Sequence, residues 1–228
     1  MKKIAVTGGA GFIGSNLVER LLSKGHQVTV VDDLSTGLKS NLDLNKITFH
    51  ELSLTDRDGL AKALSGADAI VHLGARGSVP RSLKNPIATH DVNATGTLNV
   101  LEAARTNGAH VIFSSSSSVY GRNGQLPKDE SMWLSPLTPY AASKLAAEGY
   151  VQAYGAAYEV PVTLLRFFNV FGPKQRPDHE YAAVLPKWIW KAMNNEAIDV
   201  YGDGSQTRDF TYVRTVLDVI EDALDRGV

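Results

Sequence analysis

Residues 3–14 read Lys3-Ile4-Ala5-Val6-Thr7-Gly8-Gly9-Ala10-Gly11-Phe12-Ile13-Gly14, an apolar strand that runs directly into a turn with a glycine at every third position. This spacing allows a tight turn, a close approach of the backbone to a diphosphate, and close packing of the next helix on the strand. Leu17 and Leu21 continue the apolar face begun by Ile13, so a helix is expected to start at this turn. Its first N–H groups would point at a bound phosphate.

A second apolar run, Val28–Val31, ends in Asp32, eighteen residues after Gly14. An acid at the end of the second strand can accept hydrogen bonds from the ribose hydroxyls of a dinucleotide. The alternative is a glycine-rich turn that binds nothing, and this alternative leaves Asp32 unexplained. The stretch therefore predicts a dinucleotide site.

Composition narrows the class of protein. The chain has 228 residues, 43% of them hydrophobic, and a net charge of −1, so no broad charge favours nucleic acid or an anionic membrane. Cysteine is absent, which excludes disulfides, thiolate catalysis and cysteine metal sites, and we predict no metal centre. No apolar run reaches the roughly 18 residues of a spanning helix. We expect a cytoplasmic protein that binds neither nucleic acid nor membrane.

Apolar runs and helical patterns alternate along the chain, which predicts an α/β protein with a Rossmann-type, doubly wound parallel sheet. We expect a NAD-binding domain over residues 1–168 and a partial substrate-binding region over residues 169–228. Surface loops are predicted at 121–137 and 172–180, which are rich in glycine, proline and polar residues. The expected strands are 3–7, 26–32, 46–51, 68–73, 109–115, 161–167 and 198–201, and the expected helices are 11–24, 57–65, 85–107, 138–158, 184–194 and one at the C-terminus.

The helix expected at 138–158 carries Tyr140 and Lys144 four residues apart, on one face. An ammonium close to a phenol favours the phenolate, so we expect Lys144 to lower the pKa of Tyr140 from about 10 toward neutral pH. Tyr140 could then exchange a proton with a hydroxyl group. Five serines, Ser114–Ser118, follow an apolar strand at the predicted ligand edge. They could bind a polyhydroxylated substrate, or form a turn that satisfies its own backbone.

Taken together, the motifs resemble the extended short-chain dehydrogenase/reductase family, and within it the nucleotide-sugar 4-epimerases. The resemblance covers most of the chain, and many motifs in the right order are more specific than any one of them. They are Thr7–Gly14, Asp32–Gly37, His72–Ala75, Asn93–Thr97, Ser114–Gly121, Tyr140–Lys144, Arg166–Pro173 and Tyr201–Phe210.

The resemblance implies that NAD is the cofactor and that Ser116, Tyr140 and Lys144 are catalytic. It also implies two sets of binding residues. The cofactor-binding set is Gly8, Gly11, Phe12, Ile13, Gly14, Asp32, Asp33, Leu34, Ser35, Thr36, Gly37, Ser53, Leu54, Leu73, Gly74, Ala75, Arg76, Asn93, Ser114, Tyr140, Lys144 and Phe168. The substrate-binding set is Ser116, Ser117, Tyr140, Asn169, Val184, Tyr201 and Arg208.

The implied reaction is epimerisation at C4 of a nucleotide-linked hexose, with UDP as the expected nucleotide and an N-acetylated sugar allowed. The implied assembly is a homodimer through helices near 93–107 and 138–158. Three features depart from the family. Thr215 stands where many relatives have Asp. Ser53 stands where an acid usually contacts adenine, and the family normally continues past position 228, so we expect a small, truncated C-terminal part.

Three other functions stay open. A uronic acid decarboxylase fits the same motifs. A 4,6-dehydratase fits less well, because Ser116-Ser117-Ser118 stands where that branch carries Thr-Asp-Glu. A NAD-binding module without catalytic activity is the third, although the joint presence of Ser116, Tyr140 and Lys144 argues against it.

Overall fold

The computed structural model describes residues 1–178, 182–200 and 202–227. A six-stranded parallel sheet in the order β3-β2-β1-β4-β5-β6 forms its centre. This is the strand order of dinucleotide-binding sheets, and it confirms the predicted fold class. The strands are β1 Lys3–Thr7, β2 Gln27–Asp32, β3 Thr48–Glu51, β4 Ala69–His72, β5 His110–Ser116 and β6 Val162–Phe167.

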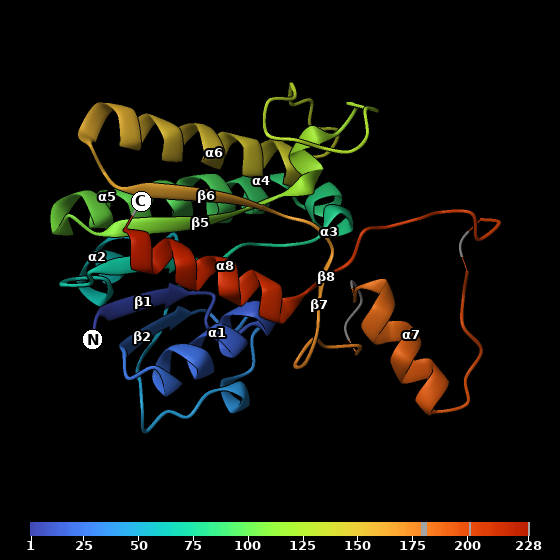
Figure 1. Cartoon of the computed structure of the whole chain (residues 1–228), viewed down its shortest axis with the longest axis horizontal. Coiled ribbons are helices and arrows are strands. Elements are labelled where there is room, and N and C mark those ends of the chain that lie inside the picture. Colours follow the sequence, from blue (N-terminus) through green and yellow to red (C-terminus); the bar gives the residue numbers. More distant parts are fainter. Residues whose placement is uncertain (179–181, 201, 228) are drawn as a thin grey trace.

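Helices cover both faces of the sheet (Figure 1). On one face, α1 (Phe12–Ser23) and α8 (Val213–Arg226) pack on Ile4 and Val6 of β1. On the other face, α2 (Arg57–Ala63), α5 (Gly96–Asn107) and α6 (Pro139–Tyr158) pack on Ala5. Successive strand residues therefore enter opposite cores, which is why the central strands are apolar throughout.

The carboxyl ends of the central strands meet at one edge. Thr7, at the end of β1, pairs with Val31 of β2 on one side and with His72 of β4 on the other. The chain leaves β1 toward one face and β4 toward the other, so a crevice opens outside these strand ends. The glycine turn, Asp32 and the serine run all follow strands at this edge.

The region from 85 to 107 is helical but not one regular helix. It contains α4 (Pro86–His90), a π-helical turn (Asp91–Thr95) and α5. Two further elements had no clear sequence signal: the short helix α3 (Val79–Lys84), and a pair of two-residue strands, β7 (Val170–Phe171) and β8 (Thr211–Tyr212).

The strand expected at 198–201 is wrong over its described residues, because residues 198–200 form no strand. Instead, side chains of α7 (Val184–Met193) donate hydrogen bonds to backbone carbonyls in and next to this segment. Trp188 Nε1 donates to the Asp199 carbonyl at 3.2 Å, and Lys191 Nζ donates to the carbonyl of Ala197 at 3.0 Å. An apolar run becomes a strand only where a neighbouring edge can pair with it.

α8 belongs to the sheet although it lies far along the chain. It shares the core with α1, and Arg20 of α1 bridges Asp218 at 2.5 Å and Glu221 at 2.6 Å. In contrast, α7 lies apart from the sheet, beyond β7 and β8 (Figure 1). Within the described residues, no helix is long and apolar enough to cross a membrane.

Candidate dinucleotide and catalytic site

The glycine turn leaves no room for side chains. Gly8 has φ +69°, and a Cβ there would lie 2.7 Å from the Gly74 nitrogen. A Cβ on Gly14 would lie 2.2 Å from the Gly8 oxygen. Helix α1 starts at Gly11 with no side-chain cap and no acid in its first turn. Its first N–H groups are therefore available to an anion, and bare backbone surrounds them.

Asp32 connects the turn to the second strand. It is 8% exposed; its Oδ2 accepts a hydrogen bond from Ala10 N and its Oδ1 accepts one from Leu34 N, both at 2.9 Å. Burial raises the pKa of Asp32, and these backbone bonds act in the opposite direction. Each oxygen keeps a further lone pair, so the carboxylate can also accept from the hydroxyls of a ribose.

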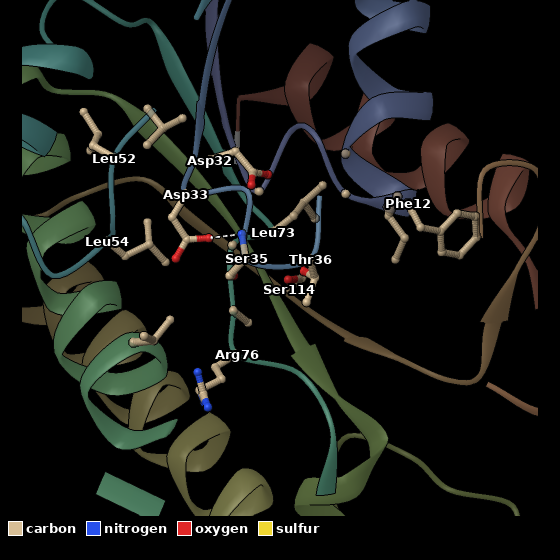
Figure 2. A pocket seen from close by; sticks show the side chains of 18 residues that line it. Phe12, Asp32, Asp33, Ser35, Thr36, Leu52, Leu54, Leu73, Arg76 and Ser114 are labelled. Carbon is tan, nitrogen blue, oxygen red and sulfur yellow. Dashed lines mark hydrogen bonds between the residues drawn. The ribbon is translucent and has the colours of Figure 1, made fainter. Parts of the chain in front are cut away.

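A cleft runs along this edge, and Figure 2 shows Asp32, Asp33, Leu54 and Arg76 around it. The buried Nε of Arg76 has no hydrogen-bond partner among the described residues. Arg76 lines the same cleft as the uncapped start of α1, and guanidinium and helical N–H groups are both groups that bind phosphate. The predicted cofactor residues that line the cleft are Gly8, Gly11, Phe12, Ile13, Gly14, Asp32, Asp33, Ser35, Thr36, Leu54, Leu73, Gly74, Ala75, Arg76 and Ser114.

The remaining predicted cofactor residues lie outside this lining. Phe168 packs on Tyr120, with ring centroids 6.1 Å apart, and borders a different hollow. Ser53 uses its hydroxyl in a local turn with Thr55, at 2.9 Å. The others are Leu34, Gly37, Asn93, Tyr140 and Lys144, whereas Val31, Leu52 and Val92 line the cleft without having been predicted. Apolar residues such as these carry no signal in the sequence that separates cleft lining from core.

Tyr140 stands at the start of α6, which Thr138 caps by accepting from Ala141 N at 3.2 Å. The ring is half-buried, and burial raises the pKa of Tyr140, while a hydrogen bond with Ser116 acts the other way. The predicted lowering of this pKa by Lys144 is therefore wrong for the protein in this state. Desolvation of the phenolate outweighs the hydrogen bond.

Lys144 is 3% exposed and turns toward the sheet. Its Nζ donates to the Ser114 carbonyl at 2.8 Å and lies 4.9 Å from the centre of the Phe113 ring. Burial lowers the pKa of Lys144 to about 8, and the charge of Glu148 opposes this shift. Because Ser114 also lines the cleft, Lys144 connects α6 to the dinucleotide edge of the sheet.

This shift predicts a pH dependence of stability. The pKa of Lys144 is about 8 in the folded chain against 10.5 ordinarily, so the unfolded chain binds more protons between these values. Its contribution to the free energy of unfolding therefore rises with pH across that window. Urea denaturation at several pH values should show the parent gaining stability relative to Lys144→Met between about 8 and 10.5. A pH-independent difference would contradict the prediction.

The serine run is ordered by its own hydroxyls. Ser116 Oγ accepts from Ser118 N at 3.2 Å and from Ser118 Oγ at 3.0 Å, and Ser114 Oγ donates to the His72 carbonyl at 3.1 Å. Ser117 is half-buried at the start of a short 3₁₀ turn. The run thus forms a local turn and presents Ser116 to Tyr140 at the same time.

The other predicted substrate residues, Asn169, Val184, Tyr201 and Arg208, belong to the C-terminal part. Asn169 Nδ2 donates to the Asp209 carbonyl at 2.9 Å, which brings Asn169 next to the segment that carries Arg208. Arg208 is exposed, and Val184 is 40% exposed at the start of α7. Tyr201 lies outside the described residues.

The sequence interpretation missed a buried ion pair between α6 and β6. Glu148 accepts from Arg166 Nε at 3.1 Å and from Nη2 at 2.9 Å, and Arg166 Nη1 donates to the Tyr120 hydroxyl at 3.1 Å. The spacing of Tyr140, Lys144 and Glu148, each four residues apart, was the available signal.

The strand order, the bare glycine turn and the Tyr–Lys helix at the same edge define a Rossmann-type dinucleotide-binding enzyme. The chain belongs to the NAD dependent epimerase/dehydratase family, which it matches over residues 4–228. NAD is its cofactor, and the cleft described above fits that dinucleotide.

Relatives within the family carry different activities. The chain is 38% identical to a putative UDP-glucose 4-epimerase of Methanocaldococcus jannaschii, over 93% of this chain and 70% of that protein. It is 36% identical to UDP-glucuronic acid decarboxylase 1 of Danio rerio, over 100% of this chain and 55% of that protein. A solved UDP-N-acetylglucosamine 4-epimerase from Methanobrevibacter ruminantium M1 superimposes with a TM-score of 0.91 at 42% identity, over 95% of this chain and 71% of that one.

Proposed function

We propose that the protein catalyses the NAD-dependent epimerisation at C4 of a UDP-linked hexose, N-acetylated sugars included. The observation that carries the proposal is the hydrogen bond of Tyr140 with Ser116, together with Lys144 of the same helix, which is bonded to Ser114 of the cleft lining. The similarity to named 4-epimerases supports it. In this proposal residues 1–168 hold the cofactor and residues 169–228 contribute to the sugar nucleotide site.

Each catalytic residue has one task. The residues of the glycine turn and Asp32 would hold NAD, which would supply reversible hydride transfer at C4 of the sugar. Tyr140 takes the proton of the 4-hydroxyl and gives it back, while Ser116 hydrogen-bonds the same oxygen. Because burial raises the pKa of Tyr140, the phenolate requires positive charge close by, which the loaded cofactor site would supply. Lys144 holds the Ser114 carbonyl at the cofactor cleft.

Binding of the sugar nucleotide falls to polar residues around the cleft. Asn169 and Arg208 hold the diphosphate, and Val184 and Tyr201 line the nucleotide pocket. Ser117, beside the catalytic serine, makes room for an acetamido group. We include a homodimer through α5 and α6 in the proposal, because α6 leaves Tyr150 at 43% and Tyr158 at 53% exposure.

Decarboxylation of a UDP-linked uronic acid is the second candidate, favoured by the match of the whole chain to a UDP-glucuronic acid decarboxylase. It needs the same oxidation at C4, so the residues of the cleft serve both reactions. The two differ in product, since only the decarboxylase releases carbon dioxide.

One experiment separates these functions. The protein is incubated with NAD and, in turn, UDP-glucose, UDP-N-acetylglucosamine, UDP-glucuronic acid and the dTDP- and GDP-linked hexoses, and C4 stereochemistry is followed by proton NMR. Appearance of the C4 epimer without net NADH confirms the proposal. Loss of carbon dioxide from UDP-glucuronic acid supports the second candidate, and NAD binding without turnover of any donor overturns both.

Asp32 is predicted to select NAD over its 2′-phosphorylated form. Asp32→Asn keeps the shape but removes the charge, so NAD affinity should fall about tenfold, the size of one weakened charge-assisted hydrogen bond. NADP affinity should fall less, because the repulsion of its 2′-phosphate is removed as well. Calorimetric titration with both dinucleotides measures the ratio of the NAD and NADP affinities. An unchanged ratio would mean that Asp32 only stabilises the glycine turn.

A further inference from the structure

A chain of hydrogen bonds crosses the sheet beneath the cleft. Gly74 N donates to Thr7 Oγ1 at 3.1 Å, and Thr7 Oγ1 lies 2.6 Å from His72 Nδ1. On the other side of the ring, His72 Nε2 lies 3.0 Å from Thr97 Oγ1, which donates to the Asn93 carbonyl at 2.6 Å. The side chains are closed off from solvent: Thr7 is 0% exposed, and His72, Thr97 and Asn93 are each 1% exposed.

Each hydroxyl or imidazole proton in this series of hydrogen bonds has only one acceptor. The Thr97 hydroxyl donates its only proton to the Asn93 carbonyl, so His72 Nε2 must donate to Thr97 Oγ1. A neutral imidazole then has an acceptor at Nδ1, which receives the Thr7 proton and leaves Thr7 Oγ1 to accept from Gly74 N. The geometry thus selects the Nε2–H tautomer and one direction for the whole chain.

This series of hydrogen bonds continues to α6, the helix that carries Tyr140 and Lys144. Asn93 Oδ1 accepts from Arg76 N at 2.7 Å, and its Nδ2 donates to Ser143 Oγ at 2.9 Å. Ser143 Oγ in turn donates to the Tyr140 carbonyl at 2.8 Å. Asn93 lies in the π-helical turn, which displaces it from the regular α-helical register. The side chain of His72 is therefore linked to the turn of α6 that carries Tyr140.

The backbone of His72 is linked to Lys144. The His72 carbonyl accepts from Ser114 Oγ at 3.1 Å, and the Ser114 carbonyl accepts from Lys144 Nζ at 2.8 Å. Burial lowers the pKa of His72 to about 3, and the positive charge of Lys144 acts in the same direction. A proton on Nδ1 would face the Thr7 hydroxyl as a second donor, so the neutral ring is the form that fits.

We propose that His72 is a positioning residue, which as its neutral Nε2–H tautomer holds the glycine turn and the Tyr140–Lys144 helix at a fixed separation. One buried ring then fixes the positions of the strand ends at the dinucleotide cleft and of the residues that face the sugar. The catalytic consequence rests on the proposed function, whereas the tautomer and the effect on NAD affinity do not.

The first test is spectroscopic and uses the whole chain labelled with ¹⁵N-histidine. Long-range proton–nitrogen correlation should show His72 with an unprotonated Nδ1 and a protonated Nε2, with no titration through neutral pH. A protonated Nδ1, or a ring that titrates near the ordinary value, would overturn the proposal. This measurement needs neither a variant nor a substrate.

The second test compares Thr97→Val, which removes the relay hydroxyl without changing shape, with Thr97→Ser, which keeps it. We expect Thr97→Val to weaken NAD binding and to lower kcat about 10–100-fold with little change in KM, because misplaced groups act on the reacting step. Thr97→Ser should restore both to within about threefold.

His110 provides the matched control, since it is a partly buried histidine bonded to Thr163 at 2.9 Å at the far end of β5. His110→Asn should change stability but neither NAD affinity nor kcat. If Thr97→Val loses stability in the same way and nothing else, His72 has no positioning role. If no sugar nucleotide is turned over while the tautomer and the NAD affinities behave as expected, the proposed function fails and the role of His72 stands.

Discussion

Replacing Tyr140 by phenylalanine is expected to lower turnover by about 10²–10⁴-fold, the usual contribution of a positioned acid–base group. The phenol is the group that hydrogen-bonds Ser116, and its ring is half-buried on the first turn of α6. Removing only the oxygen keeps the ring packing, so NAD affinity and the free energy of unfolding should change little. Turnover is measured by NMR on the preferred sugar nucleotide.

Tyr150→Phe is the control, because Tyr150 is exposed on the same helix and carries no proposed role in the reaction. It should turn over substrate at the parental rate. Near-parental turnover by Tyr140→Phe would instead show that another group accepts the proton, and Tyr140 would not be the general base of the proposed epimerase.

Replacing Arg166 by methionine is expected to lower the free energy of unfolding by about 3–5 kcal/mol, because a buried carboxylate would lose its partner. The side chain of Glu148 is 2% exposed and that of Arg166 is 12% exposed, so water cannot replace the guanidinium. Arg166 also donates to Tyr120, whose hydroxyl in turn donates to the Asp129 carbonyl at 3.0 Å. Loss of Arg166 should therefore loosen the loop after β5 as well. Urea denaturation measures the change.

Two comparisons make this result specific. Arg105→Met breaks a similar pair with Glu102, but those side chains are 44% and 30% exposed, so it should cost only about 0–1 kcal/mol. The double variant Arg166→Met/Glu148→Leu should recover most of the stability lost in the single variant, since no charge stays buried alone. A small loss in Arg166→Met would mean that water or rearrangement solvates Glu148.

The strands of the main sheet could be predicted because each is a short apolar run next to a polar boundary. Ile4, Ala5 and Val6 predict a strand buried on both faces, and both cores indeed contain them. The run at 198–201 looked the same, yet residues 198–200 pair with no strand. The difference lies in what surrounds each run, which local sequence does not contain.

The candidate site likewise has features that local sequence predicts and features that depend on the surrounding structure. Glycine spacing, the acid at position 32 and the four-residue step from Tyr140 to Lys144 are local properties, so the sequence alone predicts a dinucleotide turn and a candidate proton-transfer pair. Only the tertiary structure decided that burial raises the pKa of Tyr140, that Glu148 faces Arg166, and that His72 joins two threonines. These depend on desolvation and on contacts between residues far apart in the chain, whose energies arise only once the sheet has brought those residues together.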